Sequence, residues 1–137
     1  MRFKKDFKLQ TAIVVDDDDL VRPTVCFMLR ALDFDVIEAA SGKEALKLLS
    51  VSKFDLVVTD LFMPEFDGLE LILEITKMAL NTPIVLMTGG GKHFPSGSKD
   101  LSNLTESAEA FGASSIIQKP FKKNDLAEII DKAVAQE

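Results

Sequence analysis

Short apolar runs rich in branched side chains alternate along this chain with segments of helical periodicity, and this alternation constrains the fold more than any other feature. Runs of this length and composition predict strands that are buried on both faces. The five predicted strands cover residues 12–15, 35–38, 55–59, 84–87 and 115–118. The pattern at 115–118 is the weaker one, and 35–38 is short enough to be an edge strand.

Helical patterns separate these strands. The first helix spans roughly residues 21–32 and begins close to Pro23, because proline cannot donate an intrahelical hydrogen bond. Ser41 and Glu44 form a capping box at the start of the second helix. The other helices are predicted from inward-facing residues: Leu69, Ile72, Leu73 and Leu80 in the third; Leu101, Leu104, Ala108 and Phe111, ended by Gly112, in the fourth; Leu126, Ile129, Ile130 and Ala133 in the fifth.

Strict β-α alternation predicts an α/β fold, a doubly wound parallel sheet with helices on both faces. In such a sheet ligands bind beyond the carboxyl ends of the strands, where the winding direction changes. Four predicted strands run into polar residues there: Asp16 and Asp17, Asp60, Thr88, and Lys119. The sequence therefore predicts that three carboxylates, a hydroxyl and an ammonium group share one small volume.

Carboxylates crowded into such a volume require a cation. Two of them about 4 Å apart repel by about 4 kcal/mol at an effective dielectric constant of about 20. Oxygen ligands, in a chain with one His and one Cys, favour Mg²⁺ over zinc. An aspartate can act as a nucleophile toward phosphorus, with Lys119 contacting the transferred anion and Thr88 donating its hydroxyl group to it. This is the chemistry of a phosphorylation switch.

Four segments resemble the signature segments of response-regulator receiver domains. They are Val-Val-Asp-Asp at 14–17, Asp-Leu-Phe-Met-Pro at 60–64, Thr-Gly at 88–89 and Lys-Pro-Phe at 119–121. The resemblance covers about residues 11–135. It implies a flavodoxin-like (βα)5 fold with strand order 2-1-3-4-5.

The same resemblance implies roles for individual residues. Asp60 is the phosphoacceptor, Thr88 and Lys119 take the switch roles, and the Lys119-Pro120 bond is cis. The implied Mg²⁺ ligands are Asp16, Asp17, Asp60 and the backbone carbonyl of Phe62. The phosphoryl donor is a sensor histidine kinase or a histidine phosphotransfer protein. The chain itself is then a switch rather than an enzyme, and it acts on a downstream protein target.

Three features depart from the family pattern. Ile116 stands three residues before Lys119, where many receivers place an aromatic switch residue. Residues 89–100 lengthen the connection after the fourth strand, and long loops are often functional. The chain ends with the fifth predicted helix, so we expect output through contact with another protein rather than through an attached domain.

Composition narrows the function classes. A chain of 137 residues predicts one domain, with residues 1–10 as an N-terminal extension and 11–137 as the receiver domain. The net charge of −6 and the absence of Trp and Tyr disfavour nucleic-acid binding. No signal peptide or membrane-spanning run is present, and the single Cys26 fits a reducing cytoplasm. We expect a monomer or a weak homodimer.

Two other functions and one structural reading compete with this interpretation. The run Asp16–Asp19 by itself fits a solvated helix cap. Asp17-Asp18-Asp19-Leu20-Val21 satisfies the D-x-D-x-[TV] motif of haloacid-dehalogenase phosphatases, with Asp17 as nucleophile and Asp19 as general acid. A receiver-like domain that binds partners without phosphorylation is the third reading.

Overall fold

The sheet has five parallel strands in the order β2-β1-β3-β4-β5, which confirms the predicted fold and strand order. The computed structural model describes residues 10–64, 66–78, 81–89, 106 and 108–135. Its strands are β1 (Gln10–Val15), β2 (Phe34–Ala39), β3 (Leu56–Asp60), β4 (Ile84–Thr88) and β5 (Ser115–Gln118). Its helices are α1 (Val21–Ala31), α2 (Gly42–Val51), α3 (Gly68–Lys77) and α5 (Lys123–Ala135).

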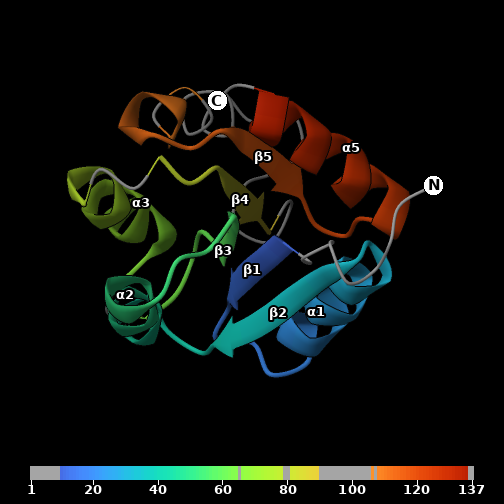
Figure 1. Ribbon diagram of the computed structural model, residues 1–137, viewed down its shortest axis with the longest axis horizontal. Coiled ribbons are helices and arrows are strands. Elements are labelled where there is room, and N and C mark those ends of the chain that lie inside the picture. The colour runs from blue at the N-terminus through green and yellow to red at the C-terminus, as the bar shows by residue number, and fades with distance from the viewer. Residues whose placement is uncertain (1–9, 65, 79–80, 90–105, 107, 136–137) are drawn as a thin grey trace, which may run out of the picture.

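Helices cover both faces of the sheet, with α2 and α3 on one side and α1 and α5 on the other (Figure 1). Side chains of a strand point alternately to its two faces, so each central strand supplies two cores. In β1, Ile13 and Val15 pack toward α2 and α3, whereas Ala12 and Val14 pack toward α1 and α5. The central strands are therefore buried on both faces, as their continuous apolar runs predicted.

Local capping signals place the helix starts where the sequence indicated. The Ser41 hydroxyl accepts a hydrogen bond from the Glu44 N–H at 3.1 Å, and the Glu44 carboxylate accepts one from the Ala40 N–H at 2.6 Å. Helix α1 begins at Val21, so Pro23 lies in its first turn, where no intrahelical donor is needed. These predictions are confirmed.

Two inward-facing assignments were wrong. Leu73 is 42% exposed, and α3 instead buries Leu71, Ile72 and Ile75. Its sequence is apolar at so many positions that periodicity could not select the buried face. Phe111 is 40% exposed as well. Leu80, the 101–105 part of the predicted fourth helix and residues 90–100 of the long connection lie outside the described residues.

Other local predictions are confirmed. Gly112 adopts a left-handed φ of 126°, and the Ala113 N–H donates to the Ala108 carbonyl at 2.9 Å, which closes the helix as a glycine C-cap does. The Lys119-Pro120 bond is cis. Cys26 is fully buried, and burial raises the pKa of its thiol to about 11. In the part of the chain that the structure describes, no helix has the length and apolar character needed to cross a membrane.

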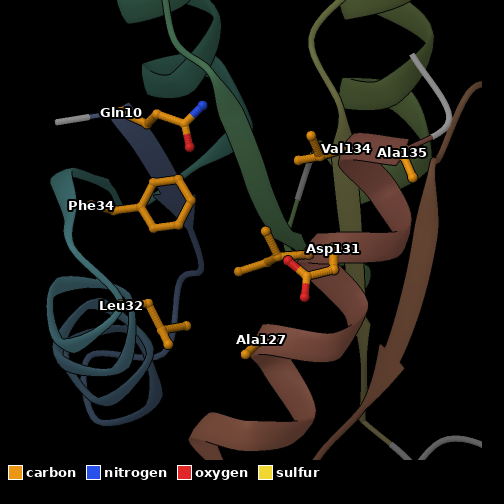
Figure 2. A pocket seen from close by; sticks show the side chains of 8 residues that line it. Gln10, Leu32, Phe34, Ala127, Asp131, Val134 and Ala135 are labelled. Atoms are coloured by element: carbon orange, nitrogen blue, oxygen red, sulfur yellow. The ribbon is translucent and has the colours of Figure 1, made fainter. Parts of the chain in front are cut away.

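A hollow of about 400 Å³ opens at the amino ends of β1 and β2 (Figure 2). Gln10, Leu32 and Phe34 lie on one side of it, and α5 residues, among them Asp131 and Val134, lie on the other. In parallel α/β sheets the functional centre lies beyond the opposite, carboxyl ends of the strands. The candidate functional site is therefore expected at that other edge of the sheet.

Candidate functional site

Three carboxylates from two strand ends converge at the carboxyl edge of the sheet. Asp16 and Asp17 follow β1, and Asp60 is the last residue of β3. One carboxylate oxygen of each lies within 4.8 Å of the others. Because β1 and β3 are parallel neighbours, their carboxyl ends meet at one edge and bring these side chains together. The convergence expected from the sequence is present.

Both the backbone and the side chain of Asp16 form hydrogen bonds with neighbouring segments. It is fully buried, and its N–H donates to the Ala39 carbonyl at 3.1 Å. One carboxylate oxygen accepts from the Asp18 N–H at 3.0 Å, and the other accepts from the Lys119 ammonium at 3.2 Å. Its backbone carbonyl accepts from an Arg22 guanidinium nitrogen at 2.8 Å. A buried carboxylate needs such partners, since an unpaired one would be strongly destabilising.

Lys119 bridges the acidic cluster from the end of β5. Its ammonium nitrogen lies 2.9 Å from an Asp60 carboxylate oxygen as well as 3.2 Å from Asp16. The loop after β5 thus places a cation between carboxylates that belong to β1 and β3. Sequence positions more than 100 residues apart, Asp16 and Lys119, meet in this way.

Burial and charge act in opposite directions on these groups. Burial raises the pKa of the Asp60 carboxyl, and the charges of Asp16 and Asp17 act in the same direction, whereas Lys119 opposes them. Burial lowers the pKa of Lys119, but the hydrogen bond to Asp60 and the two carboxylate charges outweigh it, so its pKa lies above the ordinary value. The lysine therefore stays charged, and the cluster as a whole favours additional positive charge.

Thr88 ends β4 beside this cluster. Its side chain is 1% exposed, and its hydroxyl oxygen has no hydrogen-bond partner among the described residues. A buried hydroxyl without a partner is costly, at about 1–3 kcal/mol. Thr88 is not among the residues that line the neighbouring cavity.

The acidic cluster opens into a cavity of about 330 Å³. Its lining includes the predicted residues and some that the sequence analysis did not select: Asp16, Asp17, Asp18, Val21, Asp60, Phe62, Gly89 and Lys119. Asp17 is exposed to solvent, and Phe62 is 37% exposed. Asp18 serves the local fold, since its carboxylate accepts from the Leu20 N–H at 2.8 Å and from the Val21 N–H, the first of α1, at 3.2 Å. The N-cap residue of α1 is Leu20, which makes no side-chain capping bond, so the helix-cap reading of the aspartate run holds only for the bond from Asp18 to Val21.

The cluster fits a hard divalent cation on the chemistry of its donors. Three carboxylates supply oxygen ligands within 4.8 Å of one another, and neither His nor Cys is among them. Such a donor set suits Mg²⁺, which favours one or two carboxylates together with a phosphate group. Asp16, Asp17 and Asp60 all line the cavity and offer carboxylate oxygens suited to hold the ion.

Gly68, which the sequence analysis overlooked, determines how closely α3 approaches the site. A Cβ at this position would clash with the backbone carbonyl of Asp60 and would lie 2.9 Å from the Leu61 Cα. The Gly68 N–H also donates to the Leu61 carbonyl at 2.8 Å. Its signal in the sequence is the Asp67-Gly68 pair at the start of a helix, with Asp67 as the N-cap.

We expect Gly68→Ala to lower the free energy of unfolding by about 1–3 kcal/mol, because the obstructing atoms belong to backbone that cannot move away. Urea unfolding measures this loss. Gly42→Ala is the matched control, since the two nearest atoms there belong to the ring of Phe66, a half-buried side chain, and the nearest backbone atom, the Phe66 carbonyl oxygen, is farther away at 3.1 Å. Equal losses in both variants would contradict the argument.

The fold and the site together define a flavodoxin-like α/β domain with an acidic, lysine-bridged centre beyond the carboxyl ends of its strands. The family model of the response regulator receiver domain matches residues 12–131. This chain therefore belongs to the response-regulator receiver family, as the sequence segments indicated.

Individual proteins support this membership. The chain is 33% identical over 124 residues to the transcriptional regulatory protein GlrR of Escherichia coli, covering 90% of this chain and 26% of GlrR. It is 32% identical over 125 residues to the transcriptional regulatory protein PdtaR of Mycobacterium tuberculosis, covering 90% of this chain and 56% of PdtaR. It thus spans about a quarter to just over half of these relatives.

A solved structure agrees in fold over nearly the whole chain. The crystal structure of a putative response regulator from Chloroflexus aurantiacus is similar with a TM-score of 0.81 and 28% sequence identity, covering 93% of this chain and 99% of that one.

Proposed function

We propose that this chain is a phosphoacceptor receiver, in which Asp60 takes a phosphoryl group from a phosphohistidine on a sensor histidine kinase or a histidine phosphotransfer protein. The observation that carries the proposal is the convergence of three carboxylates with Lys119 in one cavity. Receiver domains of this family are signalling modules that interact with histidine kinases and downstream targets, and they generally bind Mg²⁺ at an acidic pocket.

The transfer needs little from the protein beyond positioning and charge. A carboxylate oxygen of Asp60 forms a bond to phosphorus, the bond from phosphorus to the imidazole nitrogen breaks, and that nitrogen keeps the electron pair. Asp16, Asp17, Asp60 and the backbone carbonyl of Phe62 would hold Mg²⁺, which would neutralise charge on the phosphoryl oxygens. Lys119, already 2.9 Å from Asp60, contacts the same oxygens.

Thr88 then carries the change toward partners, and Ile116 limits it. The unpartnered Thr88 hydroxyl gains an acceptor when Asp60 is phosphorylated, which favours a small movement at the end of β4. Ile116, paired with Leu86 across β4 and β5, is half-buried against the core on the α2 and α3 side. An isoleucine offers no ring that could swing between buried and exposed positions. We therefore expect output to depend on a movement at the end of β4.

The phosphatase alternative fits the site less well. It assigns general-acid catalysis to Asp19, whose side chain is 83% exposed and pairs with Arg22 at 2.7 Å. Asp19 does not line the cavity that holds Asp17 and Asp60. Such an enzyme also leaves Lys119 and Thr88 without a role. We therefore favour a protein that is itself phosphorylated over one that turns over external phosphate esters.

We further propose that residues 11–137 form the receiver domain after an extension at 1–10. Gln10 already pairs with Phe34 as the first residue of β1, so the boundary lies at the edge of the sheet. Phosphotransfer from a histidine kinase places the chain in the cytoplasm, where the buried, reduced thiol of Cys26 is stable.

Phosphorylation by a small donor tests the proposal directly. We expect the wild-type protein incubated with phosphoramidate and MgCl₂ to gain one phosphoryl group, measured by intact mass after acid quenching. EDTA should abolish the gain, and hydroxylamine should remove the group, because it cleaves acyl phosphates. Absence of an adduct, or an adduct that resists hydroxylamine, would contradict an aspartyl phosphate. Continuous hydrolysis of a phosphate monoester by the unmodified protein would favour the phosphatase.

A further inference from the structure

We propose that Arg22 is a positioning residue for the metal site: it holds the loop that carries Asp16 and Asp17 in the conformation that binds Mg²⁺. This inference rests on the proposed function and extends it to a residue outside the cavity. The observation behind it is a three-way contact made by one guanidinium group with the aspartate loop and with β2.

The contacts of Arg22 are short and come from separate segments. One terminal nitrogen donates to the Asp16 backbone carbonyl at 2.8 Å, and the other donates to the Asp19 carboxylate at 2.7 Å. The Nε–H donates to the Glu38 carboxylate, in β2, at 3.0 Å. The planar guanidinium thus ties both ends of the Asp16–Asp19 loop to the neighbouring strand, which a lysine cannot do with its single nitrogen.

The location of Arg22 supports a specific role rather than a general surface charge. Its side chain is only 14% exposed, although it lies in the first turn of α1. A cation at a helix N-terminus is unfavourable toward the helix dipole. Asp19 and Glu38 are 83% and 39% exposed, so these ion pairs alone would contribute little. The bond to the Asp16 carbonyl is the contact that reaches the site.

Asp16 transmits this restraint to the cavity. Its carboxylate contacts Lys119, and its peptide bond leads directly into Asp17, whose side chain lines the cavity. Without Arg22, the Asp16 carbonyl loses its donor from α1, and the loop gains freedom at the residue before Asp17. Partners that orient metal ligands typically change metal affinity by about ten- to a hundredfold.

The two possible roles of Arg22, as a charge and as a positioning group, predict opposite changes in Mg²⁺ affinity when the arginine is removed. If the arginine acted only as a charge, its removal would leave the acidic loop more negative and would tighten Mg²⁺ binding. If it positions the loop, its removal weakens binding. Measuring Mg²⁺ affinity therefore distinguishes the two roles without reference to phosphorylation.

We expect Arg22→Met to raise the dissociation constant of Mg²⁺ by about tenfold, measured by isothermal titration of the folded protein with MgCl₂. Arg22→Lys keeps the positive charge but loses the planar guanidinium group with its separate nitrogen donors, and we expect it to weaken Mg²⁺ binding as well. The matched control is Arg30→Met, which removes an arginine that contacts β2 through the Val36 carbonyl at 3.4 Å, far along the same helix from the aspartate loop. It should leave Mg²⁺ affinity unchanged.

Each outcome decides the question. Unchanged or tighter binding by Arg22→Met overturns the inference, and so does an equal loss in Arg30→Met, which would indicate general destabilisation. If Arg22→Met fails to fold, as judged by circular dichroism, Arg22→Lys takes its place, and unchanged affinity in that variant overturns the inference as well. If the wild-type protein binds no Mg²⁺, the proposed function itself fails; if it binds and the Arg22 variants bind equally, only this inference fails.

Discussion

Replacing Asp60 with asparagine is expected to abolish phosphorylation by phosphoramidate and MgCl₂. The amide of asparagine is not a nucleophile toward phosphorus, so the substitution removes the proposed acceptor oxygen. Because the substitution preserves shape, the cavity and the fold should persist. Intact-mass analysis of the quenched reaction should therefore show the adduct in the wild-type protein and only the unmodified mass in Asp60→Asn.

Two further variants make this result specific. Asp33→Asn is the matched control: Asp33 is exposed, lies outside the cavity and has a φ of 70°, a conformation that asparagine tolerates well. It should be phosphorylated like the wild type. Asp17→Asn should slow the reaction and raise its Mg²⁺ requirement. An adduct that persists in Asp60→Asn but disappears in Asp17→Asn would instead identify Asp17 as the nucleophile and would favour the phosphatase.

Lys119→Met is expected to lower the free energy of unfolding in Mg²⁺-free buffer by about 3 kcal/mol. Removing one partner of a buried ion pair costs about 3–5 kcal/mol, because it leaves an uncompensated charge. Here both Asp16 and Asp60 lose their cation. We take the lower end of that range because the Lys119 side chain is 20% exposed. Urea unfolding monitored by circular dichroism measures the difference.

Repeating the unfolding measurement with MgCl₂ tests why Lys119→Met lowers the free energy of unfolding. If unpaired carboxylates are responsible, MgCl₂ should bind the more negative cluster and reduce the difference between Lys119→Met and the wild type. Lys122→Met provides the control, since Lys122 is an exposed lysine at the end of the same loop, directly before α5. It should be neutral in both buffers. A difference between Lys119→Met and the wild type that is unaffected by Mg²⁺ would indicate lost packing rather than lost charge.

The magnitude of the switch bears on how such a receiver signals. Moving a two-state equilibrium from 1:99 to 99:1 requires about 5.5 kcal/mol of differential interaction. Phosphorylation of Asp60 would extend its existing contact with Lys119 and would offer an acceptor to the Thr88 hydroxyl, which has no partner among the described residues. With Ile116 at the position of the usual aromatic residue, no ring adds a second packing change. Partial activation is therefore the expected behaviour of the phosphorylated protein.

Much of this fold could be predicted from the amino-acid sequence. Continuous apolar runs of branched residues identify strands that are buried on both faces, and capping pairs such as Ser41 and Glu44 identify helix starts, because both signals depend on local chemistry. Parallel winding then places the residues after each strand at one edge. The sequence could therefore predict that Asp16, Asp17, Asp60, Thr88 and Lys119 lie at that edge.

Other features of the fold and the site depend on contacts between segments that are distant in the sequence. The exposure of Leu73, the close approach of Gly68 to the Asp60 carbonyl, and the hold of Arg22 on the Asp16 carbonyl have no period or spacing that reveals them. Each depends on the relative placement of a helix and a strand, which packing sets to within a few tenths of an ångström. The sequence thus determined which chemical groups come together at the site. Tertiary packing determined the distances between them and the contacts that hold them in place.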